Sequence, residues 1–332
     1  MKVDYAKPPF SITEAMLSRV AEISELVGGM AAFSSFETKP HLRKNNRIES
    51  IHSSLAIEAN SLSLDAVRDV INGHEVVGSQ REIREVQNAY RAYDELERLD
   101  PFDVGELKRV HGIMTEGLVR ESGKFRSGGE GVYDGEKLIF MAPPLEMISG
   151  HIENLFGWLK QVRGSLSALI YSCVFHYEFM FIHPFADGNG RMARLWQTAL
   201  LSDWRRVFRY LPIESHIHKY QGGYYEAIDR CNKEGESTLF IEFMLEQIAA
   251  TLKEAAAQVS SADSQLSEYV KHLLSIMEYD VPYTASTLLG KLNLKSKEML
   301  RKNYLDPAIS LNLVTMTIPD KPTSRNQRYV RR

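Results

Sequence analysis

Residues 183–194, His-Pro-Phe-Ala-Asp-Gly-Asn-Gly-Arg-Met-Ala-Arg, bring several chemically capable side chains into one short stretch of the chain. His183 can accept a proton near neutral pH, and Asp187 offers the hard oxygen ligand that Mg²⁺ uses when it also binds substrate phosphates. The turn Gly188-Asn189-Gly190 leads into a predicted helix, whose first N–H groups attract anions. A base, a metal ligand and a phosphate site together predict phosphoryl or nucleotidyl transfer.

The residues after this turn predict a helix. Its apolar residues recur at helical spacing, at Met192, Leu195, Trp196, Ala199 and Leu200. Arg191 and Arg194 then share one face of the helix, where each can bind a phosphate through charge-assisted hydrogen bonds. The stretch is not a nucleotide P-loop, because that loop needs G-x-x-x-x-G-K-[ST] and no lysine stands in the required place.

Each of these side chains also has an ordinary structural explanation. His183 can pack against Phe185, Asp187 can cap the helix, and the arginines can lie in solvent. For any one residue taken alone, we favour that explanation. For the whole cluster, we favour the phosphate-transfer interpretation.

The stretch closely resembles the signature of Fic-domain proteins, H-x-F-x-[DE]-G-N-G-R-x-x-R, and matches it at every specified position. The resemblance implies a mainly α-helical fold and transfer of AMP from ATP to a Ser, Thr or Tyr hydroxyl of a target protein. It implies that His183 deprotonates the hydroxyl and that Asp187 holds Mg²⁺. The related Doc kinases carry lysine where this helix begins, so Gly190 favours AMP transfer over phosphate transfer. The ATP-binding residues implied within the signature are Asp187, Gly188, Asn189, Gly190, Arg191, Met192, Ala193 and Arg194.

A second segment, residues 53–60, places Ser54 and Glu58 one helical turn apart. From the residues alone, Glu58 is a surface glutamate near a helix end. The segment also resembles the inhibitory helix of Fic proteins, [ST]-x-x-x-E-[GN], which implies that Glu58 pairs with Arg194 at the ATP site. From its place one turn away, Ser54 is expected to steady the glutamate by a hydrogen bond. Because the segment lies upstream of the signature, inhibition is expected to be of the N-terminal kind. Ala59 departs from the motif at the Gly/Asn position.

Residues 123–144 predict a β-hairpin, because Asp134-Gly135 lies between two apolar runs and Pro143-Pro144 ends the second. Such a hairpin can be structural trim, and its strand edge can also pair with an extended peptide. The resemblance implies a flap that clamps the target segment over the site. The residues expected to line it, and counted with Glu58 among the implied ATP-binding residues, are Leu138, Ile139, Phe140 and Met141.

Tyr224, Tyr225 and Asn232 lie on a further predicted helix. The spacing of Tyr225 and Asn232 alone suits the edge of an amphipathic core. The resemblance implies instead that these residues form the wall of the adenine pocket, by stacking and hydrogen bonding.

Length and pattern predict more than one domain. At 332 residues, one large domain and a smaller one are expected. We expect an N-terminal helical region over 1–110, a catalytic core over 111–255, and a further domain over 266–332. Residues 39–47 are basic and polar and are expected to form a solvated loop. Residues 255–265 are rich in alanine and serine and predict a linker or a long helix end.

The last domain differs in charge and pattern. Residues 266–332 hold eleven Lys/Arg against six Asp/Glu, a net charge of +5, so the net charge of −3 for the chain leaves −3 − 5 = −8 for residues 1–265. Three short helices over 266–277, 284–292 and 296–305 and two strands over 313–318 and 327–330 predict a winged-helix-like α+β fold. DNA binding and protein binding remain equally open for it.

The remaining sequence features exclude several classes of protein. Only Cys173 and Cys231 occur, without metal-type spacing, so a disulfide scaffold and a zinc protein are excluded and a reducing cytoplasm is expected. Residues 1–5 lack the apolar core of a signal peptide, and polar residues interrupt the apolar run 166–182, so no membrane span is expected.

Two classes of function follow. The first is an AMP transferase restrained by Glu58; in some relatives the same site also removes AMP. The second is a nucleotide-sensing transcription regulator that binds ATP through a Fic-like domain and DNA through its last domain. The complete signature, with His183 in place, favours the transferase. Self-modification and a homodimer stay open.

Overall fold

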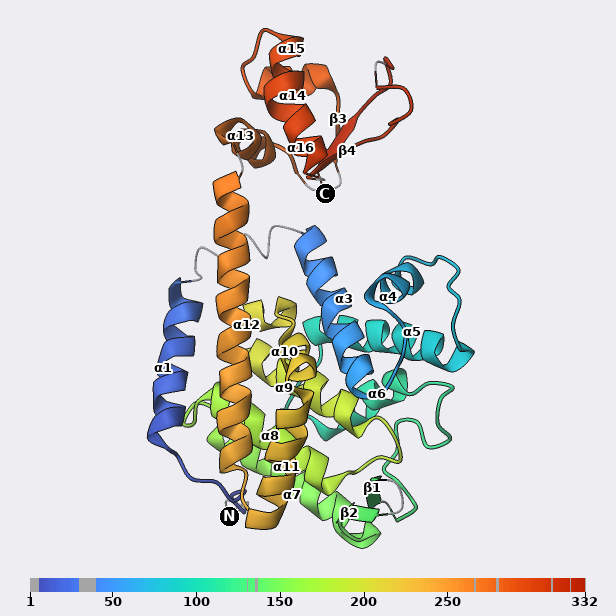
Figure 1. Ribbon diagram of the computed structural model, residues 1–332, viewed down its shortest axis with the longest axis vertical. Helices are drawn as coiled ribbons and strands as arrows, with labels where there is room; N and C mark the ends of the chain where they lie inside the picture. Colours follow the sequence, from blue (N-terminus) through green and yellow to red (C-terminus); the bar gives the residue numbers. More distant parts are fainter. Residues whose placement is uncertain are drawn as a thin grey trace. The chain divides into compact units, whose positions relative to one another are not determined.

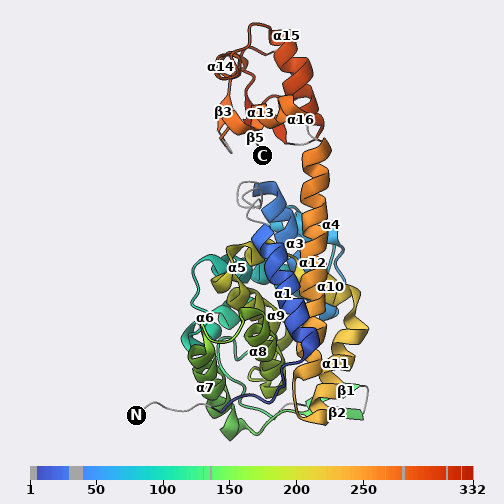
Figure 2. The same cartoon turned by 90° about the vertical axis from the view of Figure 1, so that its left-hand side faces the viewer.

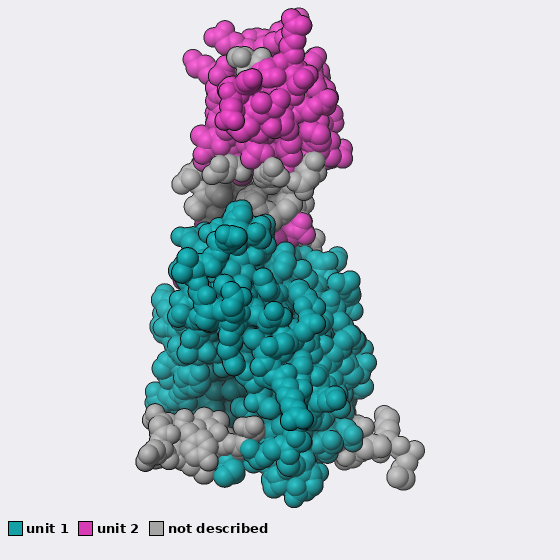
Figure 3. All heavy atoms as spheres, turned by 90° about the vertical axis from the view of Figure 1, so that its right-hand side faces the viewer, with its two compact units in different colours: residues 1–32, 44–253 teal, residues 33–43, 254–332 magenta. Residues whose placement is uncertain are grey.

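The computed structural model describes residues 6–29, 40–129, 131–134, 137–265, 267–278, 281–311, 313–322 and 324–331. The chain divides into two compact units (Figure 3). The first comprises residues 1–32 and 44–253, and the second comprises residues 33–43 and 254–332. The predicted boundaries after residues 110 and 255 stay predictions.

The first unit is mainly helical (Figure 1). Two helices, α3 and α12, continue from it into the second unit. The helices are α1 (Glu14–Gly29), α3 (Pro40–Ile57), α4 (Leu64–Ile71), α5 (Gln80–Asp94), η2 (Glu95–Glu97), α6 (Val104–Met114), α7 (Leu145–Val162), α8 (Ala168–Ile182), α9 (Asn189–Trp204), η3 (Arg206–Tyr210), α10 (Ile213–Lys219), α11 (Gln221–Glu234) and α12 (Thr238–Gln265).

The core of this unit is built on α8 and α9. Twelve of the fifteen residues of α8 are buried, as expected of a helix that is apolar on every side. On α9, the buried Trp196 packs with Phe156 of α7 and Phe175 of α8, at ring-centroid distances of 6.2 and 6.5 Å. The signature therefore lies between two helices that cannot shift easily, because both are packed in the interior.

Around this core, α1 runs along α12 (Figures 1 and 2). Thr13, just before α1, donates from Oγ1 to Oε1 of Glu242 at 2.6 Å, and Nζ of Lys253 lies 2.5 Å from Oε1 of Glu22. The serine- and alanine-rich stretch after residue 255 is the end of α12, one of its two predicted alternatives. Among the described residues, no helix is both long and apolar enough to span a bilayer.

The expected loop at residues 39–47 is wrong from Pro40 onward, because α3 begins there. Ile48, Ile51 and Leu55 are 1%, 0% and 1% exposed and lie at helical spacing, so tertiary burial of this stripe stabilises the helix. The polar residues that suggested a loop include Lys44, which is exposed on the same helix. Proline suits a first helical turn, where its missing N–H costs nothing.

The predicted hairpin is present. Strands β1 (Gly131–Asp134) and β2 (Lys137–Met141) pair antiparallel, with Val132 opposite Phe140. A bulge lies between Val132 and Tyr133 and shifts the register there. The chain thus has the mainly α fold with a β-hairpin that the sequence predicts.

The second unit contains a small α+β fold. Its three-stranded antiparallel sheet has the order β3-β5-β4, and β3 was not expected from the sequence. Leu273, Leu288 and Ala308 from three of its helices are fully buried in one core. The winged-helix arrangement stays a prediction. Its elements are α13 (Glu268–Ile276), β3 (Pro282–Tyr283), α14 (Ala285–Lys291), α15 (Lys297–Met299), η4 (Leu300–Leu305), α16 (Asp306–Ser310), β4 (Val314–Met316) and β5 (Tyr329–Arg331).

Candidate active site

The signature forms a tight loop between α8 and α9. His183 ends α8 in the left-handed region, with φ of 49°, and Gly188 precedes α9 with φ of 84°. Asn189 closes the loop, because its Oδ1 accepts from the Phe185 N–H at 3.0 Å and its Nδ2 donates to the Phe185 carbonyl at 2.7 Å. Both polar atoms of the Asn189 side chain are therefore used inside the loop. The first N–H groups of α9 have no acceptor within the helix and can bind an anion.

His111 of α6 packs against this loop and holds it by a hydrogen bond. Its ring stacks on Phe185 at a centroid distance of 3.6 Å and an interplanar angle of 4°. Its Nδ1 accepts from the Gly123 N–H at 3.0 Å, so Nε2 carries the proton and donates to the Asp187 carbonyl, also at 3.0 Å. Burial lowers the pKa of His111 to about 4. The ring is therefore neutral near pH 7 and acts as a fixed spacer.

Arg126 joins the base of the hairpin to the loop. Its Nε donates to the His183 carbonyl at 2.8 Å, and its backbone N–H donates to the Pro184 carbonyl at 2.9 Å. Its Nη2 donates to the Pro143 carbonyl at 2.6 Å. The side chain is 4% exposed, so this charge is buried among carbonyl oxygens that satisfy it. Arg126 thus fixes the position of the hairpin base relative to the signature loop.

His183, the predicted base, lies at the start of the loop. Burial lowers its pKa below the ordinary value, while the Met180 carbonyl acts in the opposite direction. Its imidazole is therefore neutral near pH 7, as a group that accepts a proton must be.

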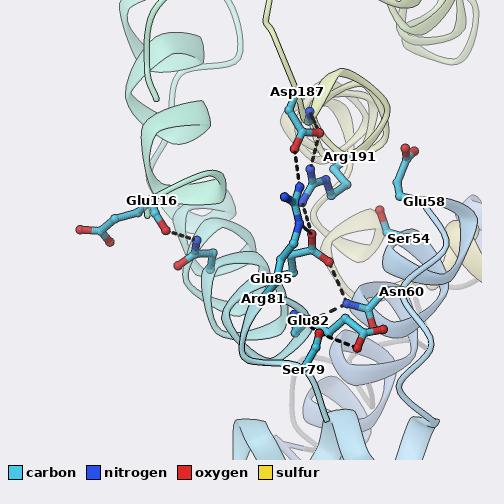
Figure 4. A network of polar contacts seen from close by, with 12 residues as sticks. Ser54, Glu58, Asn60, Ser79, Arg81, Glu82, Glu85, Glu116, Asp187 and Arg191 are labelled. Atoms are coloured by element: carbon cyan, nitrogen blue, oxygen red, sulfur yellow. Dashed lines mark hydrogen bonds and ion pairs between the residues drawn. The ribbon is translucent and has the colours of Figure 1, made fainter. Parts of the chain in front are cut away.

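Asp187, the predicted metal ligand, lies among cationic groups (Figure 4). Its Oδ1 accepts from the Gly188 N–H at 2.6 Å and from Nη2 of Arg191 at 2.8 Å. Its Oδ2 accepts from Nη2 of Arg81 at 3.2 Å. Glu85, one turn after Arg81 on α5, lies 3.9 Å from Nη1 of Arg191. The signature arginine is thus held between two carboxylates.

Arg194, the second signature arginine, is held by the predicted inhibitory segment. Its Nε donates to Oγ of Ser54 at 3.0 Å, and its Nη2 donates to the Ser54 carbonyl at 2.9 Å and to Oε1 of Glu58 at 2.7 Å. The Arg194 side chain is 1% exposed and that of Glu58 is 36% exposed. The structure therefore brings together the two residues whose pairing the resemblance implied.

The Glu58 carboxylate also lies directly against Gly190. A Cβ atom at Gly190 would lie 2.2 Å from Oε1 of Glu58 and 3.2 Å from Nη1 of Arg194, so only glycine leaves room for the carboxylate. Ala59 follows Glu58 with φ of 63°, a conformation that the Gly or Asn of the motif adopts more easily. The position where the sequence departs from the motif is therefore the position of a backbone turn that needs positive φ.

The predicted adenine wall lies on α11, and its residues differ in accessibility. Tyr224 is fully buried, with its hydroxyl 2.9 Å from Nε2 of His176. Tyr225 is 44% exposed, and its hydroxyl donates to the Ile57 carbonyl at 3.4 Å. Asn232 lines a cavity of about 270 Å³, and its Oδ1 accepts from the Tyr177 hydroxyl at 2.9 Å. Tyr225 and Asn232 present accessible groups, whereas Tyr224 supports them from the interior.

The hairpin residues are only partly described. Met141 is 59% exposed at the end of β2. The side chains of Leu138, Ile139 and Phe140 lie outside the described part of the structure. Their expected contact with a target stays a prediction.

Sequence reasoning missed four residues of the site: Arg81, Glu85, His111 and Arg126. His111 and Arg81 lie 76 and 106 residues before Asp187, which each of them contacts. No local pattern marks such residues, because their role depends on contacts between distant segments. His111 alone gives a hint, because its helical spacing from Leu107 and Met114 places a polar residue on the apolar face of the predicted helix.

Curated proteins similar to this chain include the "Protein adenylyltransferase Fic" of Aedes aegypti and that of Nematostella vectensis. The first is 28% identical over 221 residues, which cover 63% of this chain and 42% of that protein. The second is 27% identical over 216 residues, which cover 60% of this chain and 47% of that protein. The matched segment thus spans less than half the length of these relatives.

Family models and solved structures that match this chain point to the same family. The Fic/DOC family model matches residues 101–201, and a model of the C-terminal domain of Filamentation induced by cAMP protein Fic-like matches residues 268–330. Fic-1 of C. elegans shares the fold at 19% identity, covering 74% of this chain and 73% of its own, with a TM-score of 0.61. A Fic family protein from Desulfovibrio desulfuricans G20 is 40% identical, covers 98% of each chain and has a TM-score of 0.75. This chain therefore belongs to the Fic/DOC family.

Proposed function

We propose that this protein transfers AMP from ATP to a hydroxyl side chain of a protein and that Glu58 restrains the reaction. The observation that carries the proposal is a pair of unused donors at the signature turn. Nε of Arg191 and Nη1 of Arg194 are buried and have no hydrogen-bond partner within the described residues. Buried cationic N–H groups without a partner are costly, and a phosphate oxygen would satisfy them.

The turn Gly188-Asn189-Gly190 provides the rest of the phosphate site. It places the first N–H groups of α9 and the positive end of the helix dipole beside both arginines. The absence of a side chain at Gly190 lets an anion approach the backbone, as the Glu58 carboxylate does in this structure. A triphosphate would therefore occupy the position that Glu58 now takes.

His183 is the proposed base. The attacking hydroxyl gives its proton to the neutral imidazole while its oxygen bonds to the α-phosphorus. The bond between the α-phosphorus and the bridging oxygen breaks, and pyrophosphate leaves with the electron pair. Because the Arg126 side chain and backbone bind the carbonyls of His183 and Pro184, the base keeps a fixed position relative to the hairpin.

Asp187 fits a divalent ion shared with substrate. Within the described residues, no three His, Cys, Asp or Glu side chains gather to hold a metal by themselves. One carboxylate beside a phosphate site is instead the donor set that Mg²⁺ accepts together with phosphate oxygens and water. Bound there, Mg²⁺ would neutralise phosphate charge. Asp187 would hold and orient it, with Oδ1 fixed by Gly188 and Arg191.

The adenine is proposed to reach α11. Tyr225 and Asn232 are seven residues apart and therefore lie on one face of that helix. The Oδ1 atom of Asn232 accepts a hydrogen bond from Tyr177, so its Nδ2 group is the one that would donate a hydrogen bond to the adenine ring. The hydroxyl target, self-modification, a homodimer, DNA binding by the second unit and removal of AMP by the same site stay predictions from the sequence.

The proposed brake acts by occupation. Glu58 binds Nη2 of Arg194 and lies against Gly190, so a productively bound triphosphate and the Glu58 carboxylate exclude each other. When Glu58 is released, the buried Arg194 loses its carboxylate partner, and a phosphate oxygen of the substrate then takes the place of the carboxylate. The alternative of a nucleotide-sensing regulator is not favoured, because it gives no role to a neutral, oriented His183.

The test is a comparison of two labelled forms of ATP. The full chain with Glu58→Gly is incubated with ATP labelled at the α-phosphate or at the γ-phosphate, alone and with a cell lysate. AMP transfer places label on protein only from the α-labelled form. Label from the γ-labelled form on the protein alone, or in excess of that in the lysate without the protein, would indicate phosphate transfer and would contradict the proposal. Failure to label any protein from either form beyond the lysate alone would contradict it as well.

A further inference from the structure

The two oxygens of Asp187 are used differently (Figure 4). Oδ1 already accepts two hydrogen bonds, from the Gly188 N–H at 2.6 Å and from Arg191 at 2.8 Å. Oδ2 has one partner among the described residues, Nη2 of Arg81 at 3.2 Å. A divalent ion bound to Asp187 with the loop intact would therefore take Oδ2, the oxygen that Arg81 contacts.

Arg81 is the more easily displaced of the two arginines. Its side chain is 61% exposed, whereas that of Arg191 is 4% exposed. Arg81 lies in the first turn of α5, so its backbone is part of the helix while most of its side chain is exposed to solvent. An exposed ion pair is weak because water screens it, so a stronger cation can replace the guanidinium at low cost.

Arg81 has a second carboxylate within reach. Its Nε donates to Oε1 of Glu85 at 3.3 Å, and the Glu85 side chain is only 13% exposed. Oε2 of Glu85 accepts from Nδ2 of Asn60 at 2.9 Å. Asn60 directly follows the inhibitory turn, so Glu85 is a fixed anchor to which Arg81 stays bound when it leaves Asp187.

We propose that Arg81 holds the place of the divalent cation at Asp187 and competes with it. Binding of the cation releases the guanidinium from Oδ2 of Asp187 while it stays bound to Glu85, and loss of the cation restores the contact with Asp187. The inference rests on the proposed function, since it takes Asp187 as the metal ligand of the nucleotide site. It adds a residue, Arg81, that sets how strongly nucleotide binding depends on the metal.

The proposal is tested by nucleotide binding rather than turnover. Calorimetry measures the affinity of the full chain for ADP with Mg²⁺ and with EDTA, and the ratio of the two affinities is the metal enhancement. Arg81→Ala removes the competing cation, so the enhancement should rise about two- to fivefold, the range expected for an exposed ion pair. Arg81→Lys keeps a cation in reach and should return the enhancement toward the parent value.

Arg91→Ala is the matched control. It removes the same charge from the same helix, but Arg91 pairs with Glu116, and its enhancement should equal that of the parent. An Arg81→Ala enhancement equal to or below the parent value, with a metal-dependent parent, would overturn the role of Arg81 alone. A parent whose ADP affinity does not change with Mg²⁺ would overturn the metal assignment of Asp187, and the Arg81 role with it.

Discussion

The two arginines of the signature are both buried, but the further partners on the two sides differ in exposure. On what we call the brake side, Arg194 is 1% exposed and is fixed by Ser54 and Glu58 through three hydrogen bonds. On the side of Asp187, the proposed metal ligand, which we call the metal side, Arg191 shares this carboxylate with Arg81, whose side chain is 61% exposed. Arg191 lies in the first turn of α9 and Arg194 in the second; the metal side includes a largely exposed arginine, whereas the arginine of the brake side is buried.

This difference in exposure suits the two sides to different functions. On the brake side, removal of Glu58 leaves the buried charge of Arg194 without its carboxylate, and such a loss is costly. An exposed pair exchanges partners with little change in free energy. The brake side is therefore suited to switch the site between two states, and the metal side is suited to exchange one cation for another.

The largest expected effect falls on neither side. His183→Ala should lower AMP transfer about 10²–10⁴-fold, the usual contribution of a general base, while ADP binding survives. The measurement is labelling from α-labelled ATP in the Glu58→Gly background, with ADP affinity by calorimetry. Transfer within tenfold of the His183 protein would show that the base is a different group.

Asp187→Ala tests the metal side directly. The variant should lose the Mg²⁺ dependence of ADP binding and about 10²-fold or more of its AMP transfer, because the ion loses its protein ligand. Parallel Mg²⁺ titrations of the variant and its parent decide the matter. Superimposable titration curves would remove Asp187 from the metal site and would end the distinction between the two sides.

Glu58→Gly tests the brake side. Loss of the carboxylate frees Arg194 and the space at Gly190, so self-labelling or target labelling should rise about five- to 150-fold at equal protein concentration. The double variant Glu58→Gly/Arg194→Ala should stay inactive if Arg194 binds the nucleotide. Equal or weaker labelling by the single variant would identify Glu58 as an ordinary residue of the helix end.

Ala59→Gly should act in the opposite direction and by less. Ala59 adopts φ of 63°, which costs an L-residue about 1–2 kcal/mol, partly offset by the greater freedom of glycine in the unfolded chain. The inhibitory turn should therefore be more stable by about 0.5–1 kcal/mol. Basal transfer should fall about two- to fivefold, whereas Ala59→Gly placed in the Glu58→Gly protein should have no effect on transfer. A rise in basal transfer would count against a strained inhibitory turn.

Local sequence signals were reliable where the structure depends on local spacing. The signature predicted the irregular loop from His183 and the start of α9, because glycine and helical periodicity act within a few residues. The Asp134-Gly135 turn likewise predicted the hairpin. The expected loop at 39–47 was wrong from Pro40 onward because the signal for α3 is not local: the helix is stabilised by burial of Ile48 and Ile51, which lie beyond the predicted loop.

The sequence by itself predicted the family and the mainly helical fold, and it identified the residues proposed as base, metal ligand and hydrogen-bond donors to phosphate. It did so because these depend on residue types at fixed spacing. Only the tertiary structure decided which groups surround them: Arg81 on Asp187, His111 under the loop and Arg126 at the hairpin. Those partners come from separate helices and loops, and a contact between distant segments forms only once the buried core has set their positions.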